Sequence, residues 1–151
     1  NPNSHFLLKN LGPEPLGNSF NGKYLFDLSR KRKVPIKNFI MNSKIVVGVG
    51  NIYASEALFK AKIRPTRQAG KVSLQSYETL SEEIVSILRQ SIDQGGTTLR
   101  DFVGSDNKPG YFKQQLEVYG RQGKECKICA STLKNKIIGQ RSSVFCPKCQ
   151  K

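Results

Sequence analysis

Several residue types are scarce in this 151-residue chain, and each scarcity excludes a class of protein. Tryptophan is absent, histidine and methionine occur once each, and 11 acidic residues stand against 25 basic ones. The longest apolar run, residues 45–49, is far shorter than the ~20 residues that span a bilayer. No charged-then-apolar leader opens the chain, so we expect neither a membrane span nor a secretory signal. The 13 glycines and 7 prolines follow no period, which excludes a collagen-like chain.

The excess of basic residues gives the chain a formal net charge of +14. A surplus of this size indicates a polyanionic partner, with nucleic acid as the first candidate and an anionic membrane as the second. The alternative is a solvated basic surface that has no partner. Because charge does not specify a fold, motifs must decide between these interpretations.

The cysteines form two Cys-x-x-Cys pairs near the end of the chain: Cys126, Cys129, Cys146 and Cys149. This spacing is typical of a zinc ribbon, because two residues between ligands turn the backbone tightly enough to aim both thiolates at one ion. Two disulfides are one alternative, which fits poorly with a chain that lacks secretion features. A redox-active pair is another, and it is disfavoured because two copies stand in a Lys-rich segment without a βαβ pattern. Residues 124–151 are too few to bury a core, so we expect one structural zinc ion to supply their folding energy.

A short β-hairpin is predicted between the two cysteine pairs. Apolar residues recur on two short stretches, and Gly139-Gln140 has the composition of the turn that joins them. Arg141 would then lie at or beside the hairpin tip. We expect two domains, a helical one over residues 1–123 and a four-cysteine zinc finger over residues 124–151.

The rest of the chain is predicted to be mainly helical after an irregular lead-in over residues 1–22. Asn51 is a good N-cap residue for one helix. The clearest helix has apolar residues at three- and four-residue spacing, with Ser73 as its cap and Gly95-Gly96 as its end. We expect helices over residues 23–33, 36–41, 51–62 and 74–94, and a loop over residues 104–110.

One turn in this helical region is suited to binding phosphate. Residues 45–50 have strand-like composition, but their two glycines favour a tight buried turn that leads into the helix at Asn51. Glycine leaves backbone N–H groups accessible, and a helix N-terminus carries partial positive charge. Lys44 stands four residues before Gly48, and residues 30–44 contain six basic side chains and no acid. This run favours contact with a nucleic-acid backbone over a merely solvated basic face.

Catalytic residues are not evident. His5 is the one histidine and lies in the lead-in, so we expect no Ser/His/Asp or Cys/His set around it. Four cysteine ligands leave zinc no open position, which makes the ion structural. Three glutamates on the predicted helices are interpreted as solvated or structural: Glu56, Glu82 and Glu83. Residue chemistry alone therefore predicts a DNA- or RNA-binding module.

Five stretches resemble formamidopyrimidine-DNA glycosylase, the bacterial base-excision enzyme for oxidised purines. They are residues 11–16 (LGPEPL), 42–56 (NSKIVVGVGNIYASE), 94–99 (QGGTTL), 105–112 (SDNKPGYF) and 118–121 (VYGR). The resemblance implies a mainly α fold, in which a helix-two-turn-helix domain precedes a small β-hairpin zinc finger. It further implies one Zn²⁺, a partner that is double-stranded DNA with an oxidised base or an abasic site, and a monomeric, nucleoid-associated protein of the bacterial cytoplasm.

The resemblance also implies roles for particular residues. Lys44 and Asn51 match positions that hold the phosphates flanking the damaged nucleotide, with Gly50 in the same turn. Arg141 matches a hairpin-tip arginine that reaches a lesion-side phosphate, and Tyr119 falls in a matching stretch as a further DNA-binding residue. Five residues resemble the lid that closes over an everted purine: Lys108, Pro109, Gly110, Tyr111 and Phe112.

The chain departs from the family at the catalytic residue. In the family, a proline at the mature N-terminus, followed by glutamate, attacks the sugar carbon; a Schiff base forms and the strand is cut by elimination. Here Pro2 follows Asn1 and precedes Asn3. We therefore expect the chain to be the C-terminal half of a bifunctional DNA glycosylase/AP lyase, which binds DNA but by itself lacks the chemistry.

Two alternatives remain open. A sister glycosylase for oxidised pyrimidines, of the endonuclease VIII type, shares the helix-two-turn-helix domain and the zinc finger, although residues 108–112 favour the purine enzyme. A non-enzymatic zinc ribbon that binds RNA or a ribosome is disfavoured by residues 48–56, because a bare ribbon needs no phosphate-binding turn.

Overall fold

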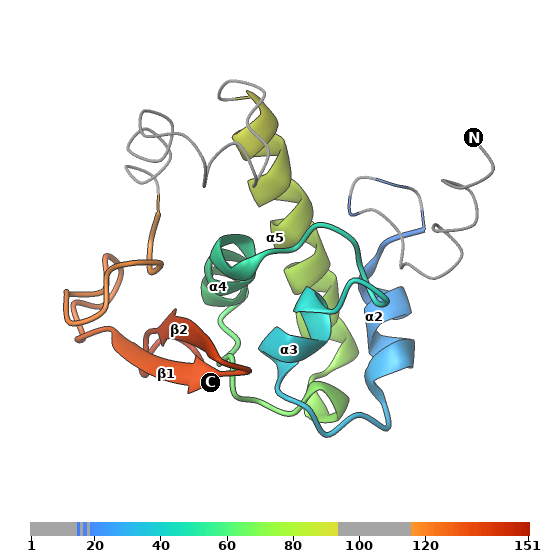
Figure 1. Cartoon of the computed structure of the whole chain (residues 1–151), viewed down its shortest axis with the longest axis horizontal. Helices are drawn as coiled ribbons and strands as arrows, with labels where there is room; N and C mark the ends of the chain where they lie inside the picture. The colour runs from blue at the N-terminus through green and yellow to red at the C-terminus, as the bar shows by residue number, and fades with distance from the viewer. Residues whose placement is uncertain (1–14, 16, 18, 94–115) are drawn as a thin grey trace.

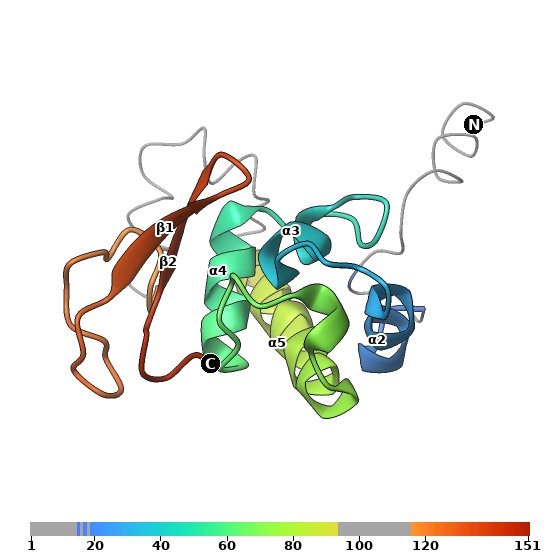
Figure 2. The same cartoon turned by 90° about the horizontal axis from the view of Figure 1, so that it is seen from below.

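The structure, a computed structural model, describes residues 15, 17, 19–93 and 116–151, with the backbone alone for residues 91–93. Helices dominate it, and a two-stranded antiparallel hairpin lies beside α4 (Figures 1 and 2). None of the described helices has the length and apolar character to cross a membrane. The elements in chain order are α2 (Gly22–Ser29), α3 (Ile36–Met41), α4 (Asn51–Lys60), η1 (Ala69–Lys71), α5 (Leu74–Asp93), β1 (Lys134–Ile138) and β2 (Arg141–Phe145).

The helical core forms where the apolar stripe of α5 meets α2 and α4. Tyr77, Leu80 and Ile84 of this stripe are fully buried, as their spacing predicts. The predicted cap is also confirmed, because Ser73 Oγ accepts a hydrogen bond from the backbone N–H of Ser76 at 3.1 Å. The predicted Gly95-Gly96 stop lies outside the described residues. The helix α4 therefore packs against α5, which fixes its position.

The segment between α3 and α4 is a series of turns, as its two glycines predict, and not a strand. Gly48 has a φ of +89°, a conformation that favours glycine. From α2, Tyr24 Oη donates a hydrogen bond to the carbonyl of the buried Ile45 at 2.5 Å. The inner side of the turn is therefore fixed, while Lys44 and Gly48 on its outer side are exposed.

The start of α4 corrects one prediction. Gly50, and not Asn51, is the N-cap residue, and no side chain caps the helix. Asn51 is the first helical residue, and its side chain instead bonds to Lys37 and to the backbone of Ser142. The local sequence could not show this, because those partners become available only when the hairpin packs against α4.

The zinc-finger hairpin runs from the pair Lys134–Phe145 to the pair Ile138–Arg141. Gly139 and Gln140 form its two-residue turn, with φ values of +57° and +66°, which is the pattern of a type I′ turn. The turn prediction is confirmed, and Arg141 lies beside the tip as the first residue of β2. A small second core joins the finger to α4: Phe59, Val118, Cys126, Leu133, Val144 and Cys146.

Candidate metal centre and nucleic-acid interface

The four cysteines converge on one point. Their Sγ atoms all lie within 4.8 Å of one another, with 3.4 Å between Cys129 and Cys146 and 3.9 Å between Cys126 and Cys149. A regular tetrahedron of Zn–S bonds of about 2.3 Å has S–S edges of roughly 3.8 Å. The cluster therefore fits one zinc ion with no position left for substrate, so the ion is structural.

The backbone around the cluster also suits thiolate ligands. The N–H groups of Ile128 and Cys149 donate to the Sγ atoms of Cys126 and Cys146 at 3.4 and 3.3 Å. Hydrogen bonds from Ser131 lower the pKa of Cys129 to about 6, whereas burial and the neighbouring thiols raise the pKa of Cys149 to about 12. Four thiolates this close require a dication, which zinc supplies.

The hairpin and the helices meet at a buried ammonium group. Lys37 of α3 is 1% exposed, and its Nζ donates to Asn51 Oδ1, to the Ser142 carbonyl at 3.1 Å and to Ser143 Oγ at 2.5 Å. Burial first, and the charge of Arg141 second, lower the pKa of Lys37 to about 8. Lys37 thus joins α3, α4 and β2 at one point, which we call the Lys37 junction (Lys37, Asn51, Ser142 and Ser143).

The Lys37 junction fixes the orientation of the Asn51 amide. An ammonium group can only donate, so the atom that faces Lys37 must be the Asn51 oxygen. The Nδ2 atom therefore points the other way and donates one hydrogen to the Ser142 carbonyl at 3.1 Å. The second hydrogen of Nδ2 also lies at the N-terminus of α4, where the helix carries partial positive charge. Donors at a helix N-terminus can bind an anion.

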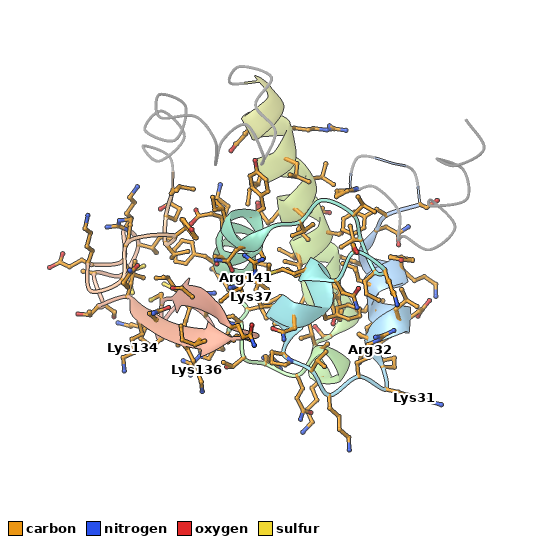
Figure 3. All side chains as sticks on the ribbon, in the orientation of Figure 1. Lys31, Arg32, Lys37, Lys134, Lys136 and Arg141 are labelled. Carbon is orange, nitrogen blue, oxygen red and sulfur yellow. The ribbon has the colours of Figure 1, made fainter. Side chains whose placement is uncertain are left out.

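Arg141 lies next to Lys37, between the hairpin and α3 (Figure 3). Its side chain is exposed and borders a groove of about 260 Å³ between the end of α3 and the hairpin tip. The tip packs closely on α3, because a Cβ on Gly139 would lie 2.9 Å from Asn38 Nδ2. The position of Arg141 is therefore set by tertiary packing as well as by the hairpin turn.

The six basic residues of positions 30–44 do not form the single basic surface that their run in the sequence predicts. Arg30 lies 3.8 Å above the Phe26 ring and donates to the Val72 carbonyl. Arg32 donates to the Leu28 carbonyl at 3.2 Å and lies over the Phe39 ring, and Lys37 is buried in the junction. Three members of the run are exposed and form no side-chain hydrogen bond within the described part of the chain: Lys31, Lys33 and Lys44. Arginine side chains pack on aromatic rings and carbonyls as readily as they bind phosphate, which a count of charges does not reveal.

The remaining predicted residues are placed as follows. Gly50 ends the turn before α4, and Tyr119 is half-buried against the helical core. Residues 108–112, the predicted lid, lie outside the described residues. The local sequence does not mark Lys37 as an organising residue. Glu56, which was expected to be solvated or structural, is structural, because it is buried with three backbone partners. One signal was available for Glu56, because it is the one charged residue among positions 52–59 of the predicted helix.

Two family models match the sequence. Residues 11–103 match the formamidopyrimidine-DNA glycosylase H2TH domain, and residues 123–151 match the zinc finger found in FPG and IleRS. A formamidopyrimidine-DNA glycosylase of Hahella chejuensis is 58% identical over 147 residues, which are 97% of this chain and 54% of that protein. The Pseudomonas aeruginosa enzyme is 59% identical over 150 residues, with coverages of 99% and 56%. The chain thus spans about half the length of these relatives.

Solved structures show the same likeness. A Lactococcus lactis formamidopyrimidine-DNA glycosylase bound to DNA with an AP site is 32% identical, with a TM-score of 0.83, and the match covers 98% of this chain and 52% of that one. The same protein in complex with DNA containing FAPY-dG is 33% identical, with a TM-score of 0.84 and coverages of 99% and 54%.

Proposed function

Because the chain belongs to the formamidopyrimidine-DNA glycosylase family, we propose that it is the DNA-binding C-terminal half of a bifunctional enzyme. That enzyme excises oxidised purines, namely formamidopyrimidines and 8-oxoguanine, and cuts the strand at the abasic site. Related structures hold DNA with an AP site or with FAPY-dG. We assign residues 1–123 to the helix-two-turn-helix domain, with a lid near residues 104–112, and residues 124–151 to the zinc finger.

The observation that carries this proposal is the Lys37 junction. Lys37 and Asn51 hold the hairpin against the N-terminus of α4, so that Arg141 and the first turn of α4 belong to one rigid surface. The exposed Lys44 belongs to the turn that leads into the same helix. Phosphate contacts from a helix N-terminus and basic side chains set the register of a protein on a duplex.

We assign the phosphate contacts to five residues of this surface and its neighbourhood: Lys44, Gly50, Asn51, Tyr119 and Arg141. Lys44 and Arg141 contribute charge, while Gly50 and Asn51 contribute donors at the start of α4. Zinc supports these contacts indirectly. Its four cysteine ligands hold the hairpin that carries Arg141. We place the enzyme on nucleoid DNA in the bacterial cytoplasm, as a monomer.

We infer that the chain by itself binds DNA without cutting it. Schiff-base chemistry needs an unprotonated amine held about 3–3.5 Å from the sugar carbon. Lys37 has a lowered pKa, but its ammonium is buried and surrounded by three acceptors, so it cannot approach a sugar. Ordinary lysines, with pKa values near ~10.4, are protonated at neutral pH.

Two assays test this proposal. Fluorescence anisotropy should show that the zinc-loaded chain binds a duplex with an abasic-site analogue, and borohydride should trap no covalent complex on a duplex containing 8-oxoguanine. Arg141→Ala should weaken binding about tenfold, the loss of one charge-assisted contact. Lys134→Ala removes the same charge from the far end of the hairpin and should change little. Absence of duplex binding, or preference for single-stranded RNA, would instead favour the zinc-ribbon alternative.

A further inference from the structure

Glu56 of α4 is a buried carboxylate with unusual partners. Its side chain is 3% exposed. Oε1 accepts the backbone N–H of Glu117 at 2.7 Å, and Oε2 accepts those of Val118 and Tyr119 at 2.9 and 2.8 Å. Among the described residues the one salt bridge joins Lys23 to Asp27, so these three N–H groups, and not a cation, compensate the carboxylate.

Burying the Glu56 carboxylate costs free energy of folding, so its presence in the core calls for an explanation. Burial raises the pKa of Glu56, and the three backbone hydrogen bonds oppose that shift by favouring the carboxylate form. The neighbouring helix positions Ala54, Ala57 and Leu58 fill the core with apolar side chains. Packing alone would therefore be served by another apolar residue, whereas only an acceptor can hold three consecutive N–H groups.

The segment that Glu56 holds ends in Tyr119, and its continuation is also fixed. Arg121 donates to the Glu117 carbonyl at 2.7 Å and to the Glu125 carbonyl at 2.8 Å. Tyr119 borders a groove of about 330 Å³ that is rich in basic side chains and lined by Leu116, Tyr119, Gly120, Arg121, Lys124 and Lys127. Residues 117–119 therefore form an ordered turn, and their hydrogen bonds to Glu56 fix its position relative to α4.

We propose that Glu56 is a positioning residue for DNA binding, which holds Tyr119 in register with the phosphate-binding N-terminus of α4. This inference rests on the proposed function. Asn51 and Glu56 are five residues apart on one helix, a rise of about 7.5 Å. The helix therefore serves as a rigid spacer: its first turn binds one part of the DNA backbone, and Glu56 sets the place of the tyrosine that contacts another part.

A double-mutant cycle tests the coupling. Tyr119→Phe removes the hydroxyl and keeps the packed ring, and it should weaken binding to an abasic-site duplex about tenfold in the otherwise unchanged chain. In the Glu56→Gln background, whose amide NH₂ cannot accept, Tyr119→Phe should have almost no further effect. Glu82→Gln removes the same charge from an exposed position of α5 and should leave the full effect of Tyr119→Phe in place.

Equal losses from Tyr119→Phe in both backgrounds would overturn the proposal, and so would an unchanged affinity of Glu56→Gln. A second measurement needs no DNA. In the zinc-loaded chain, the amide protons of residues 117–119 should exchange at least tenfold faster in Glu56→Gln than in the unchanged chain, and equal exchange rates would show that Glu56 does not hold the segment. If these amide protons exchange faster in Glu56→Gln but the unchanged chain binds no duplex, the proposed function and the proposed coupling to DNA binding both fail. The contact between Glu56 and residues 117–119 is then confirmed as a structural one.

Discussion

At the scale of single residues, the interface depends on an ammonium group with no anionic partner among the residues that the structure describes. Lys37 is held by a side-chain amide, a backbone carbonyl and a hydroxyl. Neutral acceptors satisfy its hydrogen bonds but do not cancel its charge. The positive potential of this buried group therefore remains beside Arg141 and the start of α4, where a phosphate can balance it.

The lowered pKa of Lys37 predicts a pH dependence of stability. Its pKa is about 8 in the folded chain, against an ordinary value of 10.5. Between these values the unfolded chain binds more protons, so the contribution of Lys37 to the free energy of unfolding rises with pH. Denaturant titrations should show the difference in stability between the unchanged chain and Lys37→Met rising from pH 8 to pH 10. A difference that is constant or falls with pH would contradict the assigned burial.

A substitution of Asn51 should change the affinity for a duplex without changing the stability of the chain. Asn51→Asp loses the hydrogen bond to the Ser142 carbonyl, but this loss is offset because the new carboxylate faces the Lys37 ammonium and a helix N-terminus, both of which stabilise an anion. The melting temperature should therefore be retained, whereas a phosphate at the same place would be repelled and duplex affinity should fall at least tenfold. Calorimetry and anisotropy measure the two quantities. Unchanged affinity would remove Asn51 from the phosphate contacts.

At the scale of elements, the zinc hairpin is folded by its metal and placed by α4. Its own apolar residues are few, and Phe59 of α4 completes the small core around the cysteines. Zinc supplies the folding energy that so small a core cannot. The position of Arg141 therefore depends on the metal and on the packing of the hairpin against α4.

Chelation of zinc should therefore unfold residues 124–151 and leave most of the helical core. Hydrogen exchange should lose protection in β1 and β2, and the far-ultraviolet signal of the helices should change little, because the larger core contains no residue of the finger. Duplex affinity should fall with the hairpin, since Arg141 and Ser142 lose their positions. A hairpin that stays protected without metal, with a mass lower by the hydrogens of two disulfides, would contradict the zinc assignment.

The same scale shows what the sequence could and could not predict. The periodicity of α5, the glycines before α4 and the Gly139-Gln140 turn are local signals, and the corresponding elements are found where they predict. The role of Lys37 and the partners of Glu56 could not be predicted, because these partners lie 105 and 62 positions away. Local charge patterns cannot distinguish a solvated lysine or glutamate from one that is buried by a distant segment.

At the scale of the whole molecule, the net charge of +14 makes binding to a polyanion favourable before any specific contact forms. This attraction depends on salt, because each neutralised phosphate releases counterions from the duplex. We propose that the specific part of the interaction lies at the junction of α3, α4 and the hairpin. On this proposal, basic residues elsewhere, such as Lys134 and Lys136 on β1 (Figure 3), should add to the general attraction alone.

The salt dependence of duplex affinity tests the central claim most directly. If about six phosphates are neutralised, the logarithm of the binding constant should fall with the logarithm of salt concentration at a slope of roughly −5. Lys44→Ala and Arg141→Ala should each reduce the magnitude of that slope by about one and weaken damaged and intact duplexes together, whereas Lys134→Ala should leave it nearly unchanged. Slopes that are the same for all four proteins would contradict the assignment of Lys44 and Arg141 to the DNA backbone.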